Sequence, residues 1–153
     1  MKKDGKSIEE VSEWLEANKL KLQHIFTVDS LAHLKRGGRI SGAAAAIGSM
    51  IQVKPMLHLD AEGKIKAGDK AKGRKKSLLM LVDYMGDNGV DLAGQRIIIS
   101  HADCADDAAF IEKKIKERHP DVGEVLIGNV GPVIGAHSGP GTAALFFLGK
   151  ERA

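Results

Sequence analysis

Several common protein classes are excluded by what the sequence lacks. One cysteine, Cys104, among 153 residues cannot form an internal disulfide, which fits a reducing compartment. No apolar run approaches the roughly 20 residues that a membrane-spanning helix needs. The opening residues, which are Met, Lys, Lys and Asp, lack the apolar segment of a signal peptide. We therefore expect a cytoplasmic protein without a membrane span.

Aromatic residues and net charge are also scarce. Four Phe, one Trp and one Tyr are too few for an aromatic core, so we expect one built from Leu, Ile, Val, Met and Ala. The net charge is +3, and residues 64–76, which hold seven cations, contain no aromatic residue that could stack on bases. We expect no nucleic-acid partner, and a solvated surface is the plainest interpretation of this stretch.

Helical spacing of apolar residues recurs in five segments, each with a recognisable start or stop signal. The predicted helices are residues 8–18 after the capping box Ser7-Ile8-Glu9-Glu10, a helix capped by Asp29 and ended by Gly37-Gly38, a helix from Ser41 closed off by Pro55, a helix with Leu78, Leu81, Val82 and Met85, and a helix capped by Asp103 with the stripe Cys104, Ala108, Ile111 and Ile115, ended by His119-Pro120.

Short apolar runs between these helices predict strands. They are residues 24–28, 56–59, 64–68, 97–99, 125–127 and 143–148. Residues 60–63 are typical of a hairpin turn, and the three isoleucines at 97–99 indicate a buried central strand. We expect one α+β domain over residues 1–153, a two-layer mixed β-sheet covered by helices mainly on one face.

Residues 131–141 hold four glycines, two prolines and one histidine between two predicted strands. A sharp strand connection would need only two or three of these residues. The alternative is a rigid cradle in which Gly135 and Gly139 let the backbone approach a ligand and present His137 and Ser138 to it. Neighbouring residues in extended chain point to opposite sides, so His137 and Ser138 cannot serve each other as base and nucleophile. A hydrolase that uses Ser138 is therefore disfavoured.

Two basic features stand beside glycine turns. Arg39 follows Gly37-Gly38 and precedes a predicted helix whose free N–H groups favour an anion, although a solvated arginine after a glycine cap is the slightly favoured interpretation from these residues alone. Arg74 and its neighbours at the next helix start oppose the helix dipole, which hints at an anionic partner. Cys104 has no second cysteine and no paired ligand motif, so we predict packing for it and no metal site.

Several segments, in order along the chain, resemble the DegV family of bacterial fatty-acid-binding proteins. They are residues 26–31, 34–40, 53–57, 73–76, 131–141 and 142–147. The resemblance is to the C-terminal domain of a protein usually built from two. The N-terminal domain, with its Asp-Ser-Thr motif and the hydroxyl residues that meet the lipid carboxylate, has no counterpart here. The chain is therefore a fragment, or a partner supplies the missing N-terminal domain.

The resemblance implies a carrier and not an enzyme. Such proteins bind a long-chain fatty acid, without a cofactor, and present its carboxyl group to a separate fatty-acid kinase. It places Arg39 near the carboxylate and the kinase surface, and Arg74 and His137 in the polar network around the head group. Small residues at 42–46 would leave room for an acyl chain against a helix. The alternative is a docking module without lipid, in which Arg39, Lys72 and Lys75 bind an acidic protein partner.

Overall fold

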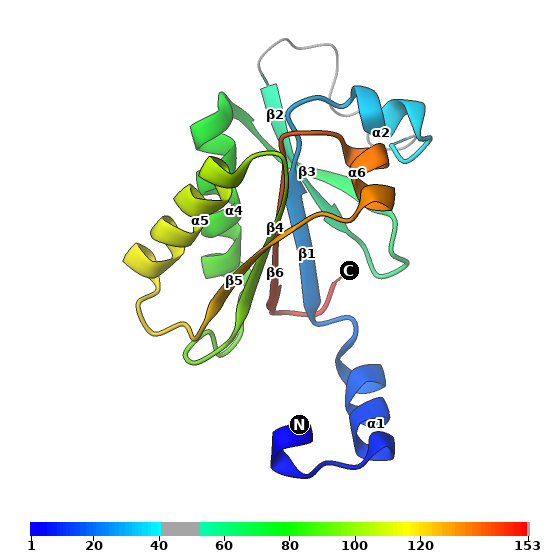
Figure 1. The fold of residues 1–153 in the computed structure, drawn as a ribbon, viewed down its shortest axis with the longest axis vertical. Helices are drawn as coiled ribbons and strands as arrows, with labels where there is room; N and C mark the ends of the chain where they lie inside the picture. Colours follow the sequence, from blue (N-terminus) through cyan, green and yellow to red (C-terminus); the bar gives the residue numbers. More distant parts are fainter. Residues whose placement is uncertain (41–52, 153) are drawn as a thin grey trace.

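Six strands form one mixed sheet in the computed structural model, which describes residues 1–40 and 53–152 (Figure 1). The strand order is β3-β2-β1-β6-β4-β5, and all neighbours are antiparallel except β4 and β5. The strands are β1 (Leu22–Thr27), β2 (Val53–Leu59), β3 (Ile65–Lys72), β4 (Ile97–Ala102), β5 (Val125–Asn129) and β6 (Thr142–Leu148). The predicted mixed sheet of an α+β fold is confirmed.

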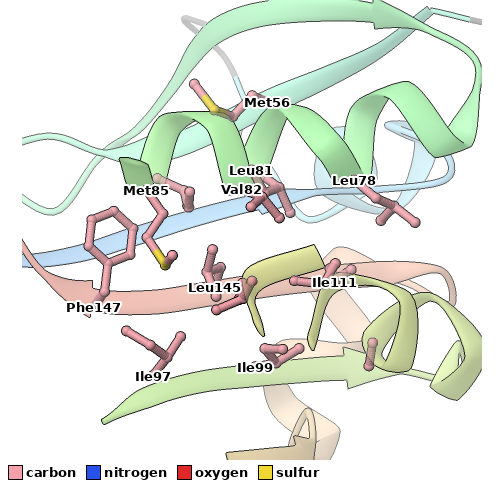
Figure 2. Packing of buried hydrophobic residues seen from close by; sticks show 14 residues of the cluster. Met56, Leu78, Leu81, Val82, Met85, Ile97, Ile99, Ile111, Leu145 and Phe147 are labelled. Atoms are coloured by element: carbon pink, nitrogen blue, oxygen red, sulfur yellow. The ribbon is translucent and has the colours of Figure 1, made fainter. Parts of the chain in front are cut away.

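Two long helices, α4 (Arg74–Asn88) and α5 (Ala105–Arg118), cover one face of this sheet (Figure 1). Each carries an apolar stripe at helical spacing, and burial of one such large side chain stabilises the fold by about 1.5–3 kcal/mol. Figure 2 shows the stripes packed against the sheet. The buried helix residues are Leu78, Leu81, Val82, Met85, Ala108, Ile111 and Ile115, and their sheet partners include Ile97, Ile99, Leu145 and Phe147. Both predicted stripes are confirmed.

Among residues 1–40 and 53–152, the elements that cover the opposite face are the short helices α2 (Ala32–Arg36) and α6 (Pro132–Ser138), which lie at one end of it (Figure 1). A second, smaller core lies there, with Val28, Leu34, Ile40 and Leu57 buried. Along the rest of this face the side chains of Ile98 and Leu126 are 42% and 39% exposed. We call this surface the open face of the sheet.

Helix α1 (Ile8–Asn18) follows the 3-10 turn η1 (Lys2–Asp4) and projects below the sheet (Figure 1). Its predicted capping box is present: the Glu10 N–H donates to Ser7 Oγ at 3.2 Å, and the Ser7 N–H donates to Glu10 Oε2 at 2.8 Å. No α1 side chain is buried. The helix therefore forms where the sequence predicts it, but its apolar side chains stay uncovered.

Two predicted helix caps are wrong. The residue before α2 is Leu31, and Asp29 instead accepts a hydrogen bond from Lys54 Nζ, which lowers the pKa of the Asp29 carboxyl. Cys104 immediately precedes α5 and makes no side-chain cap bond. Asp103 lies one residue further out, at φ 51°. Local sequence thus located the helices to within about two residues but misassigned their caps.

Three further expectations need correction. Only Ile97 and Ile99 of the isoleucine run are buried, because Ile98 points to the open face. Pro55 lies inside β2, beside a register shift. The predicted loop at 131–141 contains helix α6, with Pro132 at its first turn. The helix predicted from Ser41 lies outside the described residues.

Candidate functional site

A cavity of about 320 Å³ opens between α2, α6 and the open face of the sheet, and we call it the α2–α6 cavity. Its wall is mostly apolar because alternate residues of the paired strands β1 and β6 point into it. The apolar lining includes Phe26, Leu34, Leu59, Ile65, Ile134, Ala144 and Phe146, and the polar lining includes His24, Arg39, His137, Ser138 and Thr142. An apolar wall with a few polar groups is typical of a small-molecule site.

Arg39 and His137, two of the predicted site residues, both line this cavity. The glycine turn after α2 positions Arg39 through two backbone hydrogen bonds. The Gly37 N–H donates to the His33 carbonyl, and the Arg39 N–H donates to the Leu34 carbonyl, each at 2.9 Å. Gly38 makes the reversal possible at φ 69°. Residues almost one hundred positions apart thus bring a guanidinium and an imidazole to one apolar cavity.

Glycines and histidines of α2 and α6 interlock. A Cβ on Gly37 would lie 2.4 Å from Nδ1 of His137, and a Cβ on Gly139 would lie 2.5 Å from Nδ1 of His33. Each helix therefore ends in a glycine that leaves room for the histidine of the other helix. This packing fixes the distance between the two helices and holds His137 at the cavity.

The other predicted residues of this segment are placed differently. Ser138 lies in the cavity wall, but its Oγ donates to the Ile134 carbonyl at 2.9 Å, inside α6. Because α6 is helical, the assumption that residues 137 and 138 point to opposite sides is wrong. Gly135 is half-buried and Gly139 is buried, and neither is among the residues that line the cavity. Their expected role in ligand binding stays a prediction.

Arg74, the third predicted anion ligand, lies outside the cavity. Its Nε donates to Asp107 Oδ2 at 2.8 Å, and its Nη2 donates to the Gly141 carbonyl at 2.6 Å. Both ion-pair partners are largely buried, with Arg74 21% and Asp107 27% exposed. Arg74 therefore ties the start of α4 to α5 and to the residue before Thr142, which is a cavity residue. These hydrogen bonds indicate that Arg74 stabilises the backbone beside the cavity.

Cys104 packs as predicted. Its Sγ donates to the Thr142 carbonyl at 3.2 Å, and burial raises the pKa of the thiol. A raised pKa leaves the thiol protonated near neutral pH, so it is a poor nucleophile. Within the described residues no group of three potential metal ligands exists, and none of their helices is long and apolar enough to cross a membrane.

A second, larger hollow of about 690 Å³ adjoins the cavity and shares Arg39, Leu59 and Ile65 with it. Lys64 and Lys66 add two cations to its wall. Arg39 thus stands between an apolar cavity and a cationic hollow. Lys72 and Lys75, the other predicted partner-binding residues, are exposed at the junction of β3 and α4 and line neither space.

His24 is a cavity residue that the sequence analysis missed. Its ring meets Phe146 edge-on, with centroids 5.4 Å apart, and burial lowers the pKa of its imidazole, with a smaller effect from Arg152. The signal was present in the alternation of β1, where residues 22, 24 and 26 share a face while 23, 25 and 27 are buried on the other.

Comparison with known proteins identifies the family. A family model described as "Uncharacterised protein, DegV family" matches residues 1–150. The chain belongs to the DegV family. A DegV domain-containing protein of Clostridium perfringens is 54% identical over 152 residues, which are 99% of this chain and 52% of that protein. The chain therefore spans about half the length of the curated DegV relatives it matches.

Solved DegV structures share the fold. A Thermus thermophilus DegV family protein, described for fatty acid binding, matches with a TM-score of 0.86 and 30% identity over 97% of this chain and 52% of that one. Bacillus subtilis DegV, described as a fatty acid binding protein, matches with a TM-score of 0.77 and 34% identity over 97% and 52%. The sequence resemblance to the DegV family is confirmed.

Proposed function

We propose that this chain forms one wall of a fatty-acid site and that its α2–α6 cavity receives the lipid. The observation that carries the proposal is the meeting of Arg39 and His137 at a cavity lined mainly by aliphatic and phenyl groups. Relatives described as fatty acid binding support the same ligand class.

The apolar surface continues beyond the cavity. Strand register puts Leu126, Ile98 and Phe146 side by side across β5, β4 and β6 on the open face. Burying about a dozen methylenes contributes on the order of 10 kcal/mol before ordering costs. A cavity of about 320 Å³ lies at the small end of the range for ligand sites. A long acyl chain therefore extends onto the open face of the sheet, and a second protein domain covers the exposed part of the acyl chain.

The carboxylate needs donors when it leaves water, because an unpaired buried charge is costly. Arg39 supplies a permanently charged guanidinium group with several N–H donors, and His137 supplies a ring N–H. Arg39 is exposed in this chain, so its guanidinium is accessible to an incoming carboxylate. The carboxyl end consequently lies near Arg39, at the mouth of the cavity.

Such a protein carries its ligand and leaves the chemistry to another protein. The only hydroxyl predicted as a nucleophile, that of Ser138, is hydrogen-bonded within its own helix. With the carboxyl group at the cavity mouth, a partner kinase can reach it, as the family resemblance implies. The N-terminal domain that the family resemblance implies, in the same chain or a separate one, closes the site.

A docking module without lipid is the second candidate, and the cationic hollow beside Arg39 favours it. Lys64 and Lys66 line that hollow, and Lys72 and Lys75 extend the positive charge to the β3–α4 junction. Glutamate substitutions at Lys72 and Lys75 separate the two functions. Kinase binding by a protein that carries no lipid, lost on these substitutions, supports the docking module. Kinase binding that is lost while lipid stays bound supports a lipid carrier that docks through these lysines.

The test is native mass spectrometry of a chimaera in which this chain replaces the matching half of the Clostridium perfringens relative. We expect fatty acid to co-purify with the chimaera from a bacterial host and to be reduced by Arg39→Gln. Arg36→Gln, at an exposed α2 position outside the cavity, is the matched control. A folded chimaera that carries no lipid contradicts the proposal. Lipid on the chimaera but not on the isolated chain shows that the second half is required.

A further inference from the structure

Strand β5 forms an exposed, apolar edge of the sheet. It pairs with β4 on one side and, among residues 1–40 and 53–152, with no strand on the other (Figure 1). The side chains of Leu126 and Ile127 are 39% and 41% exposed, and Gly128 and Asn129 are exposed as well. An edge strand of this kind offers its backbone N–H and C=O groups to a further strand.

The two edges of the sheet differ in how they are protected. β3, at the other edge, carries Lys66, Lys70 and Lys72, and lysines along an edge oppose the addition of a further strand. Its pairing with β2 also contains a register shift, between Pro55 and Leu57. β5 has the sequence Val-Leu-Ile-Gly-Asn, without a charge or a proline, and it pairs with β4 in an unbroken register. Of the two edges, β5 is the one suited to strand pairing.

Alternate residues of β5 direct their backbone groups away from β4. In a strand, the N–H and C=O of one residue point to one neighbouring strand and those of the next residue point to the other side. The Glu124 carbonyl accepts from the Ile97 N–H at 3.0 Å, and the Val130 N–H donates to the His101 carbonyl at 2.9 Å. The even-numbered residues of this segment therefore face β4. The residues whose N–H and C=O point to the outer edge are Val125, Ile127 and Asn129.

The spacing of these three outward residues makes β5 complementary to a second copy of itself. In an antiparallel pair, residues of a hydrogen-bonded pair exchange both N–H···O bonds. With Ile127 opposite Ile127 of a second copy, Val125 lies opposite Asn129 of that copy. Every outward N–H and C=O of both strands then has a partner. The contact uses the same surface on both copies, so it closes as a two-fold dimer and does not continue into a filament.

The charged side chains beside this edge are paired. Asp107 and Arg118 face α4, so the opposite side of α5 lies towards the β5 edge. That side carries an ion pair in which Lys116 Nζ donates to Glu112 Oε1 at 2.6 Å. Because α5 packs on β4, the α5 helices of two copies would lie three strand spacings apart, about 14 Å, with these side chains between them. Two copies therefore meet along paired charges, which avoids the cost of unpaired like charges.

We propose that β5 pairs in antiparallel orientation with β5 of a second copy of this chain, with the two-fold axis at Ile127, so that one sheet continues through both copies. The ion pair of Arg96 with Glu124, at 2.9 Å, keeps the start of β5 neutral in this contact. Two strands of five residues bury less than the roughly 1,600 Å² of a standard interface, so we expect a weak dimer, with a dissociation constant on the order of 10–100 μM. The inference does not rest on the proposed function, because the α2–α6 cavity is lined by other elements.

The first test is sedimentation velocity of the chimaera defined above, from about 1 μM to about 1 mM. We expect the sedimentation coefficient to rise with concentration towards that of a dimer. Asn129→Pro removes one outward N–H from each copy and should weaken the association about tenfold or more. Asn129→Ala is the matched control, because it keeps this N–H, and it should change the dissociation constant by less than about threefold.

The second test locates the two-fold axis by cysteine cross-linking. Residues of a hydrogen-bonded antiparallel pair have Cα atoms about 5.5 Å apart, which a disulfide can span. Ile127→Cys should therefore form a covalent dimer on oxidation with diamide. Asn129→Cys should not, because the two copies of residue 129 lie about 13 Å apart in this register. Both variants keep Cys104, so its own reactivity is the same in the two.

The outcomes separate this inference from the proposed function. A dimer that is weakened by Asn129→Pro and cross-linked through Ile127→Cys supports the inference whether or not fatty acid is bound. A protein that stays monomeric at every concentration overturns it and leaves the edge to an extended peptide of another protein. A dimer that Asn129→Pro and Asn129→Ala affect equally, or that cross-links equally through Ile127→Cys and Asn129→Cys, also overturns it. Circular dichroism verifies that the variants keep the fold.

Discussion

His137 occupies the space that a side chain at Gly37 would need, 2.4 Å from Nδ1 to the position of the missing Cβ. Gly37 has φ −75°, a conformation open to any residue, so an alanine there acts only through this contact. The packing of α2 on α6 therefore depends on a glycine for steric reasons and not for backbone conformation.

Gly37→Ala displaces the His137 imidazole or separates α2 from α6, with a stability cost of about 1–3 kcal/mol. Fatty-acid retention by the chimaera should fall, as measured by native mass spectrometry. Gly131→Ala is the control, because its Cβ meets nothing within 4 Å. Equal retention in the two variants would show that the position of His137 does not matter for binding.

The two glycines of the predicted cradle should respond oppositely to alanine. Gly135 lies inside α6 with open space around its Cβ, so Gly135→Ala should stabilise the fold by about 0.5–1 kcal/mol through helix propensity. Gly139 has φ 82° and faces His33, so Gly139→Ala should destabilise it by roughly 1–3 kcal/mol. Urea unfolding measures both. A loss of lipid in a stable Gly135→Ala variant would support the predicted direct ligand role of Gly135.

Arg74 should contribute mainly to stability. Arg74→Met leaves the Gly141 carbonyl and the Asp107 carboxylate without their donor, which costs about 1–3 kcal/mol. Lys75→Met, at the next and exposed position, should change the free energy of unfolding by less than about 0.5 kcal/mol. If the two variants unfold alike while Arg74→Met alone loses lipid, Arg74 is a ligand residue and its contacts to α5 are incidental.

Stability should fall as the pH is lowered below neutral. Burial lowers the pKa of His24 and of His58 below the usual value of 6.5, so the unfolded chain takes up protons first. Their stabilising effect is complete above pH 6.5 and is lost as the pH falls from 6.5 towards the lowered values. Urea unfolding at pH 7.5 and 5.5 measures the difference. His24→Phe should lose less stability between these pH values than the parent, and an identical loss would assign the effect elsewhere.

The main helices were predictable because their signals are local. The stripes of α4 and α5 and the capping box of α1 all lie within one or a few helical turns. Helix α6 was missed because Gly135 and the flanking glycines and prolines lower helix propensity. Its ends did carry a helix signal, with Pro132 in the first turn and Gly139 just beyond the last residue.

The site depends on sheet pairing that no local pattern encodes. Helix α2 follows the end of β1, and α6 precedes the start of β6. Antiparallel pairing of Thr27 with Ala143 puts those two ends together and so brings Arg39 to His137. The family resemblance assigns Arg39 and His137 to one polar network, but it gives no geometric reason for their proximity. It assigns Arg74 to the same network, although the Arg74 side chain is hydrogen-bonded to Asp107 and Gly141 outside the cavity.

The central claim is that the α2–α6 cavity holds the fatty acid with its carboxyl group near Arg39. The most direct measurement is a crystal structure of the chimaera as purified from its bacterial host. We predict an acyl chain against Phe26 and Phe146, with a carboxyl oxygen within hydrogen-bonding distance of Arg39 or His137. An empty cavity in a protein that carries lipid elsewhere, or a carboxyl group at the opposite end of the acyl chain from these residues, would contradict it.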